Sequence, residues 1–568
     1  MRSAIDETLN NLIRRLLELR TPDGHWEGRL ASSALSTATA VIALHLSGAS
    51  RDVVSRGLDW LSKNQNADGG WGDTTISLSN ISTTALCWSA FTVTGREDAT
   101  AVVAAERWLS AKAGGFDPDH LAYAIAARYG SDRTFSVPIL TVLALAGKIS
   151  WRRVPQLPFE LAAAPQSWFR WLRLPVVSYA LPALIAIGLV RHRHRPTRNF
   201  LARIARHIAT DRTLRVLREI QPTTGGFLEA TPLTSFVVMS LIAADERDNP
   251  VVREGVGFLV RSVRDDGSWP IDTNLATWVT TLSVNALAHS AALSSDDRKR
   301  VTDWLLAQQY RVIHPYTQAP PGGWAWTDLA GGVPDADDTA GALVALKNLG
   351  APAGPPIDAA VEWLLGLQNR DGGMPTFCRG WGKLPFDRSS PDLTAHAILA
   401  WSLWSSNVSG LGRAITYLKK NQRKDGSWSP LWFGNQHIKT EENFTYGTAR
   451  VLIALGALQN RKLAPLLKRG VAWLIAAQNN NGGWGGAKGS PSSIEETGLA
   501  VEALSVVVPR DTQAILRGAE WLIAATDSGR RTRPAPIGFY FAKLWYFEEL
   551  YPLIFAIGGL TRARATME

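Results

Sequence analysis

A repeated segment constrains this chain more than any other feature of the sequence. RGLDWLSKNQNADGGW (Arg56 to Trp71) returns as GRAITYLKKNQRKDGSW (Gly412 to Trp428) and as KRGVAWLIAAQNNNGGW (Lys468 to Trp484). Looser copies include those that end at Trp26, Phe116, Trp269, Trp324 and Met374. Copies that follow one another at roughly 45 to 55 residues are typical of arrays of helix pairs.

Each copy has the same internal order. An apolar helix ends in Gln, a Gly-containing turn ends in an aromatic residue, and a helix of small residues follows, such as TAVIAL, TAGALVAL or TARVLIAL. This order predicts helix, tight turn, helix, and therefore an almost wholly α-helical chain. We expect the Gln and Trp side chains to hydrogen-bond and stack at the turns and to tie neighbouring units together. The pattern allows either an open solenoid or a closed ring.

The repeat is interrupted between Gly147 and about Arg198, where WRRVPQLPFELAAAPQSWFRWLRLP breaks the period. We interpret this stretch as separating two groups of repeats. The predicted domains are residues 21–265 and 266–568, with a helix over 1–20 packed at their junction. Within the stretch, the apolar run Val176 to Val190 is shorter than the ~20 residues that span a membrane. It predicts a buried helix or an interfacial segment with basic flanks.

Composition excludes several classes of protein. The 568 residues are 46% hydrophobic and can fill a large core. Cys87 and Cys378 lie far apart and outside any C-x-x-C pattern, which argues against a disulfide framework and a structural zinc site. The first twenty residues predict an amphipathic helix rather than a signal peptide, so we expect a chain on the cytosolic side. A net charge of +10 suits an anionic membrane surface or nucleic acid, but no nucleic-acid module is present in the sequence, so we expect no nucleic-acid partner.

Three carboxylates crowd the start of one small-residue helix, in PDADDTAGALVAL (Pro334 to Leu346). Asp335, Asp337 and Asp338 cannot all ionise cheaply in a confined space, so at least one should keep its proton at neutral pH. Ordinary capping of a helix by Asp explains the same residues without chemistry. The motif therefore predicts either a proton donor, a helix cap, or both.

The repeats and PDADDTA together resemble the squalene-hopene cyclases, which are bacterial class II triterpene cyclases. The resemblance runs from GHWEG near the N-terminus to GFYFAKLWYFEELYP near the C-terminus. It implies an all-α fold in which two α/α barrels enclose a large apolar cavity and dock on one leaflet of the cell membrane, on its cytoplasmic side. It also implies an apolar isoprenoid substrate, with squalene as the first candidate, and no metal or other cofactor. It allows a homodimer.

The resemblance assigns roles to the acidic motif and to one histidine. It implies that Asp337 donates a proton to an alkene, which requires a strong acid in a dry site, while Asp335 and Asp338 tune and orient it. SSPDLTAHAIL is similar to the D-V-T-A-H segment of the family, so His396 would polarise the acid and return protons to it, with Asp392 nearby. A single His on an apolar helix is also a common core residue.

Aromatic residues form the rest of the predicted site. Carbocations need electron density that is not easily alkylated, and aromatic faces supply it. The resemblance places four aromatic residues at the cavity: Trp278, Trp326, Phe377 and Trp432. Further matches, which core packing would explain equally, are Tyr179, Tyr540 and Phe547.

The chain also departs from the family pattern. Val279 follows Trp278 where the family has Asp, one turn ends in Met374, and an insertion follows Trp432. Leu544 and Phe547 stand where the family has a strip rich in Tyr. These changes keep acid-initiated cyclisation but leave squalene as substrate and hopene as product open.

Three alternatives compete with a squalene cyclase. The same acid could serve another long-chain terpene, or the barrels could form a binding protein without chemistry. A protein prenyltransferase subunit would need a zinc-binding set of Asp, Cys and His, and neither cysteine lies in such a context. A metal-dependent reaction lacks its D-D-x-x-D motif, because DDRKR at Asp296 has no final acid.

Overall fold

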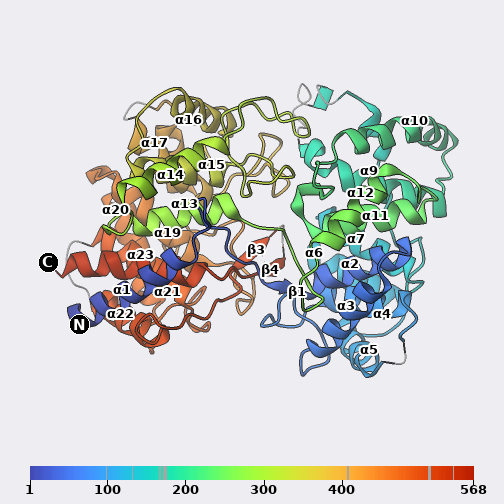
Figure 1. Ribbon diagram of the computed structural model, residues 1–568, viewed down its shortest axis with the longest axis horizontal. Coiled ribbons are helices and arrows are strands. Elements are labelled where there is room, and N and C mark those ends of the chain that lie inside the picture. Colours follow the sequence, from blue (N-terminus) through green and yellow to red (C-terminus); the bar gives the residue numbers. More distant parts are fainter. Residues whose placement is uncertain are drawn as a thin grey trace.

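The repeats fold into two rings of helices that lie side by side in the computed structural model (Figure 1). The structure describes residues 1–97, 99–130, 132–165, 168–169, 176–405, 408–508, 513–540 and 543–567. In each ring an inner layer of helices is surrounded by an outer layer, as expected for α/α barrels. The predicted all-α fold of two barrels is confirmed.

The N-terminal barrel has an inner ring in which each helix contacts the next and the last contacts the first. The inner helices are α2 (Ala34–Ser47), α4 (Ile81–Val93), α7 (Arg133–Leu145), α9 (Val176–His194) and α11 (Thr231–Ala243). Around them lie α3 (Arg51–Lys63), α5 (Thr100–Ala113), α6 (Pro118–Tyr129), α10 (Phe200–Glu219), α12 (Pro250–Arg261) and the 3-10 helices η1 (Phe159–Ala163) and η2 (Phe227–Glu229).

The C-terminal barrel closes in the same way. Its inner helices are α13 (Ala276–Leu287), α15 (Ala336–Leu349), α17 (Pro391–Trp404), α19 (Phe444–Ala457), α21 (Ile494–Val507) and α23 (Tyr551–Thr566). Its outer elements are α14 (Ser295–Ala307), α16 (Pro355–Leu367), α18 (Leu411–Lys420), η3 (Arg461–Leu463), α20 (Ala464–Ala476) and α22 (Gln513–Ala525). The predicted boundary at 265/266 falls in the segment between α12 and α13.

Two short antiparallel ribbons complete the described elements. Strand β1 (Ser32–Ser33) pairs with β2 (Trp269–Pro270), and this ribbon joins the start of the N-terminal barrel to the segment that leaves it. Strand β3 (Gly538–Tyr540) pairs with β4 (Leu544–Tyr546) just before α23. Both ribbons lie in the middle of the molecule in Figure 1.

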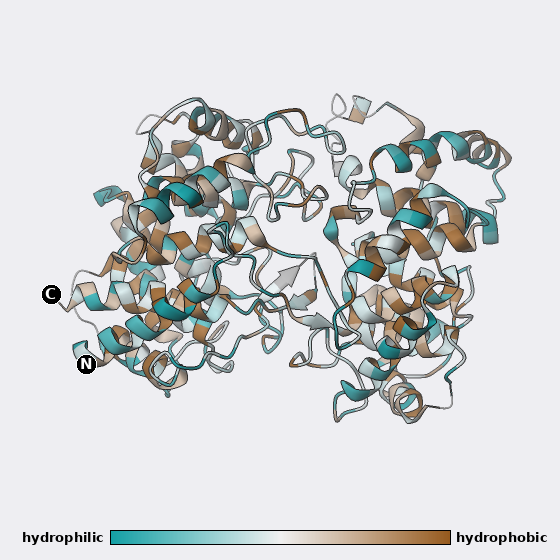
Figure 2. Ribbon diagram, in the orientation of Figure 1, coloured by the Kyte–Doolittle hydropathy of each residue, from teal (hydrophilic) through white to brown (hydrophobic). Residues whose placement is uncertain are grey.

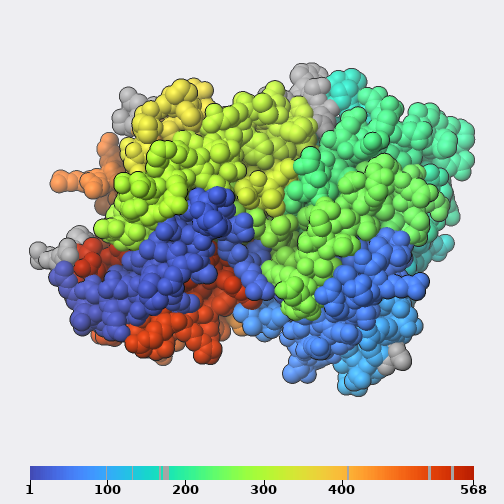
Figure 3. All heavy atoms as spheres, viewed as in Figure 1, coloured from blue at the N-terminus to red at the C-terminus, as the bar shows by residue number. Residues whose placement is uncertain are grey.

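The first helix does not lie at the junction of the barrels, where the sequence placed it. Helix α1 (Arg2–Glu18) packs against α23 and α22, so it supplies the outer partner of the last inner helix of the C-terminal barrel. Asp6 on α1 lies 2.6 Å from the Arg564 guanidinium on α23. In Figure 3 this N-terminal segment, in blue, crosses the left lobe. Figure 2 shows hydrophilic residues along α1 and α14, as expected for outer helices.

The interrupted stretch between Gly147 and Arg198 does not separate the two domains. It contains α9, an inner helix of the N-terminal barrel, so the interpretation of this stretch as a divider was wrong. The apolar run within α9 is a buried helix, the first of the two predictions made for it. Leu181, Ile185 and Leu189 are fully buried along it.

The Gln and Trp that recur in the repeats both hydrogen-bond at the turns, but only the Gln joins neighbouring units as expected. The Gln368 side chain donates to the carbonyls of Gly372, in its own turn, and Gly410, in the next unit, at 2.8 and 3.0 Å. The Trp484 indole donates instead to the Leu474 carbonyl of its own helix at 2.7 Å. The Gln therefore ties neighbouring units together, while the Trp closes the turn of its own unit.

Candidate active site

A threonine fixes the register of five of the six inner helices named above for the C-terminal barrel, from α13 to α21. The backbone N–H that ends a repeat turn donates to its Oγ1: Trp324 to Thr339 at 3.0 Å, and Met374 to Thr394 at 2.9 Å. The same bond recurs at Thr280, Thr448 and Thr497. The residues two positions before these threonines therefore occupy equivalent places in the first turns of five inner helices. These residues are Trp278, Asp337, Asp392, Tyr446 and Glu495.

The acidic motif does cap its helix. Asp335 is the N-cap of α15, and its Oδ1 accepts from the backbone N–H groups of Asp337 and Asp338 at 2.8 and 2.9 Å. Its own N–H donates to the Trp324 carbonyl at 3.0 Å, which ties the cap to the repeat turn. Because Asp335 does the capping, the Asp337 carboxyl is free for another contact.

Asp335 and Asp338 both have raised pKa values, in line with the proton retention that the crowding of the motif predicted. Burial raises the pKa of Asp335 to about 7, with the nearby Asp337 charge acting in the same direction. Burial, followed by the charge of Asp335, raises the pKa of Asp338 well above its usual value. Asp338 is 5% exposed, and within the described part of the chain its Oδ1 has no hydrogen-bond partner. A second full negative charge in this space is unfavourable.

Asp337 pairs with His396 across two inner helices. Its Oδ1 lies 2.5 Å from Nδ1 of the imidazole, which is on α17. Gly341 on α15 lies beside the ring, and a Cβ there would be 3.0 Å from Thr281 Oγ1 and 3.4 Å from His396 Cε1. Burial and then the Arg450 charge lower the pKa of His396, while Asp337 acts against them. The predicted pairing of these two residues is present.

Asp392 holds the position on α17 that Asp337 holds on α15. It is 4% exposed, and burial raises its pKa to about 6. Its Oδ1 accepts from the Ser390 hydroxyl and from the Leu431 backbone N–H. The Asp392 carboxyl therefore has hydrogen-bond partners of its own, separate from the Asp337–His396 pair.

Phe377 is the centre of the predicted aromatic cluster. Its ring centroid lies 6.2 Å from that of Trp326, 6.3 Å from that of Trp432 and 5.2 Å from that of Tyr179. The preceding residue, Thr376, accepts a bond from the Ala336 N–H of the acidic motif at 2.8 Å. The structure therefore brings these four aromatic residues together next to the acid.

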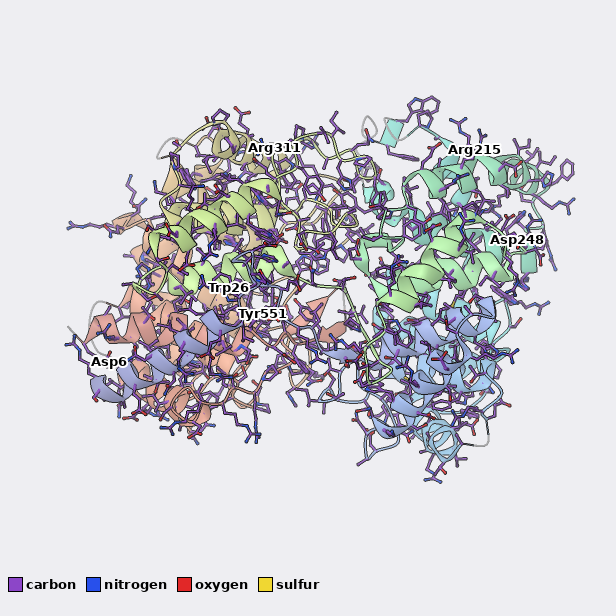
Figure 4. The ribbon with its side chains drawn as sticks, in the orientation of Figure 1. Asp6, Trp26, Arg215, Asp248, Arg311 and Tyr551 are labelled. Carbon is purple, nitrogen blue, oxygen red and sulfur yellow. The ribbon has the colours of Figure 1, made fainter. Side chains whose placement is uncertain are left out.

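Trp278 approaches from the other side of the pair. Its ring meets His396 edge-on, with centroids 6.3 Å apart, and its indole N–H donates to the Tyr551 hydroxyl at 2.9 Å. Its backbone N–H donates to the Trp326 carbonyl at 3.1 Å, which joins it to the aromatic cluster. Figure 4 labels Tyr551, on the side of the left barrel that faces the middle of the molecule.

Of the predicted residues, Phe547 is not brought to the acid, and Tyr540 cannot be compared. The side chain of Tyr540 lies outside the described residues. Phe547 is half-buried after β4, and its carbonyl accepts from the Ala31 N–H at 2.9 Å. Among the described residues, no ring contact joins Phe547 to the cluster around Phe377.

Sequence reasoning missed three residues of the site. Tyr446 stacks on Phe433 with centroids 4.1 Å apart, Arg450 lies beside His396, and Tyr551 holds the Trp278 indole. Tyr446 and Arg450 could have been found from their spacing to Thr448, which repeats the spacing of Asp337 and Gly341 to Thr339. For Tyr551 the repeat pattern contains no corresponding signal.

A pocket of about 930 Å³ opens beside the cluster. Tyr179 and Phe377 belong to its wall, and Trp381, Arg370 and Arg379 also line it. Within the described part of the chain, neither of these guanidinium groups pairs with a carboxylate. The pocket is large enough for a long apolar ligand with a polar end.

Comparisons with known proteins match most of the chain. Family models described as the squalene-hopene cyclase N-terminal and C-terminal domains match residues 9–202 and 274–565. A squalene-hopene cyclase from Bradyrhizobium diazoefficiens is 25% identical over 92% of this chain and 89% of its own length. Enfumafungin synthase from Hormonema carpetanum is 27% identical over 95% of this chain, which spans only 47% of that protein.

A solved structure shows the same fold over the whole chain. It is an ent-copalyl diphosphate synthase from Streptomyces platensis, with a TM-score of 0.60, 19% identity and 100% coverage of both chains. Among the described residues, none of the helices combines the length and the apolar character that a membrane span requires.

Proposed function

Since the chain belongs to the squalene-hopene cyclase family of class II terpene cyclases, we propose that it protonates the terminal double bond of a linear polyprene, in the first instance squalene, and cyclises the resulting carbocation. The observation that carries the proposal is the 2.5 Å contact between Asp337 and His396 beside the Phe377 cluster. A buried carboxyl with an imidazole partner next to apolar aromatic faces suits proton transfer to an alkene.

The reaction follows from the groups in place. The Asp337 proton forms a C–H bond with one alkene carbon, the π pair of the alkene is consumed, and the other carbon becomes a cation while Asp337 becomes a carboxylate. Each ring closure then uses the next π bond. Loss of a proton, or capture of water followed by loss of a proton, ends the sequence and leaves the enzyme able to take a proton again. The faces of Trp278, Trp326, Phe377 and Trp432 stabilise the intermediate charge, by about 2 kcal/mol each when desolvated.

A polyprene with an anionic head group is the second candidate substrate. Arg370 and Arg379 line the pocket that reaches Tyr179 and Phe377, and a guanidinium matches phosphate oxygens in a forked geometry. A hydrocarbon such as squalene would make no use of these two cations. The pocket therefore favours testing a prenyl diphosphate beside squalene.

The test is incubation of the detergent-solubilised protein with squalene and, separately, with geranylgeranyl diphosphate. Products are analysed by gas chromatography and mass spectrometry, after phosphatase treatment in the second case. A cyclic isomer or hydrate from squalene supports the first candidate, and a cyclic product from the diphosphate alone supports the second. No cyclic product from either, with correctly folded protein, would contradict both.

Membrane attachment is a further part of the proposal, and the exposed apolar residues of α10 support it. Leu201 and Ile208 are 75% and 73% exposed, and with Ile204 they follow helical spacing on one side of α10. Arg206 on the same helix forms two bonds to Glu160 of η1, where Leu161 is also exposed. Apolar residues flanked by arginines are typical of helices that lie in a membrane interface.

A second group of exposed apolar residues lies near the pocket. Val312 and Ile313 are exposed directly after Arg311, and Trp381 is exposed in the pocket wall. Arg311 and α10 both lie along the upper edge of the molecule in this view (Figures 1 and 4). We propose that this edge meets one leaflet on the cytoplasmic side. The homodimer that the resemblance allows stays a prediction.

Replacing Leu201 and Ile208 together by Glu is expected to weaken binding to vesicles of phosphatidylglycerol and phosphatidylcholine by roughly tenfold or more. The reason is that the variant loses the free energy gained when these two apolar side chains move from water into the membrane. Flotation of the protein with the vesicles measures the change. The matched control is Ile475→Glu on α20, another exposed apolar residue. Equal flotation of all three proteins would contradict α10 as the attachment site.

A further inference from the structure

A partly buried cation in the C-terminal barrel has no part in the mechanism above. Arg450 on α19 follows Thr448 by two residues, and His396 on α17 follows Thr394 by two residues. The shared register of these threonines puts the two side chains at the same height on adjacent helices. Arg450 Nη2 lies 3.3 Å from His396 Nδ1, the same nitrogen that faces Asp337 Oδ1 at 2.5 Å.

The chemistry of Nδ1 decides where the proton of the pair lies. This nitrogen either carries a hydrogen or offers one lone pair, and a guanidinium only donates. Arg450 on the same side is compatible with a lone pair at Nδ1, which then accepts the Asp337 hydroxyl hydrogen. An imidazolium beside the guanidinium would place two positive charges together. The lowered pKa of His396 agrees, since burial and Arg450 are its two leading causes.

Arg450 itself keeps its charge in this place. Burial lowers the pKa of Arg450. Charge interactions outweigh burial and raise this pKa; they come from Tyr446, Asp337, Glu502 and Asp392. Its guanidinium carbon lies 5.9 Å from the Tyr446 ring centroid. Glu502 comes from α21 and lies against Gly558 of α23, where an added Cβ would be 3.0 Å from Glu502 Oε2. The barrel therefore surrounds Arg450 with groups that favour a permanent cation.

We propose that Arg450 is a positioning residue for the acid: it keeps His396 uncharged, so that the shared proton stays on Asp337, and it stabilises the carboxylate that Asp337 becomes after proton transfer. The inference deepens the proposed function and rests on it for its catalytic meaning. The state of the imidazole can be measured without turnover.

The first experiment uses full-length protein labelled with ¹³Cε1-histidine, with His396→Asn to assign the signal. In the wild type, we expect the His396 signal to remain that of a neutral imidazole through the pH range in which a free imidazole takes up its proton. In Arg450→Met we expect the imidazole to take up its proton at a higher pH than in the wild type, because Asp337 then faces the ring without the cation. The same titration in both proteins would overturn the proposal.

The second experiment is the pH profile of turnover on whichever polyprene the protein cyclises. Arg450→Met is expected to lose roughly ten- to hundredfold in kcat at pH 7 and to gain a new pH dependence near neutrality, while Arg450→Lys recovers part of the rate. The matched control is Arg191→Met, which removes a buried guanidinium, on α9, whose Nε donates to the Val154 carbonyl at 2.7 Å. The control should change stability but leave the profile as in the wild type.

The two experiments distinguish failure of the proposed cyclase function from failure of the proposed role of Arg450. An altered imidazole titration in Arg450→Met, with no cyclic product from any tested polyprene in the wild type, would remove the proposed function and keep the electrostatic role of Arg450. Turnover in the wild type with an unchanged pH profile in Arg450→Met would remove the inference and keep the function.

Discussion

Replacing Asp337 by Asn is expected to lower the rate of cyclisation by roughly 10³-fold or more, within the range that general acids contribute. The amide has nearly the shape of the carboxyl but no acidic proton for the alkene. The helix should keep its start, because Asp335 and not Asp337 accepts the capping bonds. Turnover measured by product mass at saturating substrate, with circular dichroism to verify folding, checks the prediction.

Asp392→Asn is the matched control for this change. Asp392 has the equivalent place on α17, is buried, and accepts bonds from Ser390 and Leu431 rather than from His396. We expect this variant to keep activity within about tenfold, since a positioning group contributes less than the donor. If Asp337→Asn were as active as Asp392→Asn, Asp337 would not be the acid.

The second large effect expected is a loss of stability between pH 5 and pH 8. The folded-state pKa of Asp335 is raised from 3.8 to about 7, and that of Asp338 is raised further by burial. The folded chain thus binds more protons than the unfolded chain over this range, so the free energy of unfolding falls as the pH rises. Each unit of pKa difference is worth about 1.4 kcal/mol, so the loss should reach several kcal/mol.

Asp338→Asn should reduce this slope, because the amide does not ionise. Urea unfolding at pH 5 and pH 8 measures the difference for each protein, and any constant cost of the substitution cancels. We expect the loss in the variant to be smaller than in the wild type. Glu362→Gln, an exposed carboxyl on α16, is the control and should not change the slope. Parallel slopes for all three proteins would contradict protonation of Asp338 in the folded state.

Sequence signals were enough to predict the helix cap at the acidic motif, the pairing of Asp337 with His396 and the aromatic residues beside them. Asp335 caps α15 because an Asp before a run of small residues is a strong cap, and this depends on neighbours in sequence alone. His396 could be matched to Asp337 because each lies in the first two turns of a small-residue helix, at a fixed distance from a repeat turn. The aromatic residues Trp278, Trp326, Phe377 and Trp432 lie on or beside the same turns, so the repeat also carried them to the site.

Three features that the sequence left open or placed wrongly depend on contacts between distant parts of the chain: the position of α1, the role of α9 and the surroundings of Arg450. The apolar face of α1 would suit several surfaces, and only the missing outer partner of α23 places it on the C-terminal barrel. The irregular stretch from Gly147 to Arg198 contains α9, which belongs to the N-terminal ring through its contacts with α7 and α11, although the repeat pattern is interrupted there. Arg450 went unnoticed because TARVLIAL reads as an apolar helix, and the groups that keep its charge come from α15, α17 and α21.

The central claim is that the reaction begins when an acid of the protein transfers a proton to an alkene. Cyclisation run in D₂O tests it directly, because Asp337 exchanges its proton with solvent between turnovers. The account predicts one non-exchangeable deuterium per product, on a methylene carbon of the first ring, because the proton adds to the CH carbon of the terminal alkene and leaves the tertiary cation, whether the reaction ends by deprotonation or by capture of water. A cyclic product without deuterium, or deuterated product formed equally fast by Asp337→Asn, would contradict it.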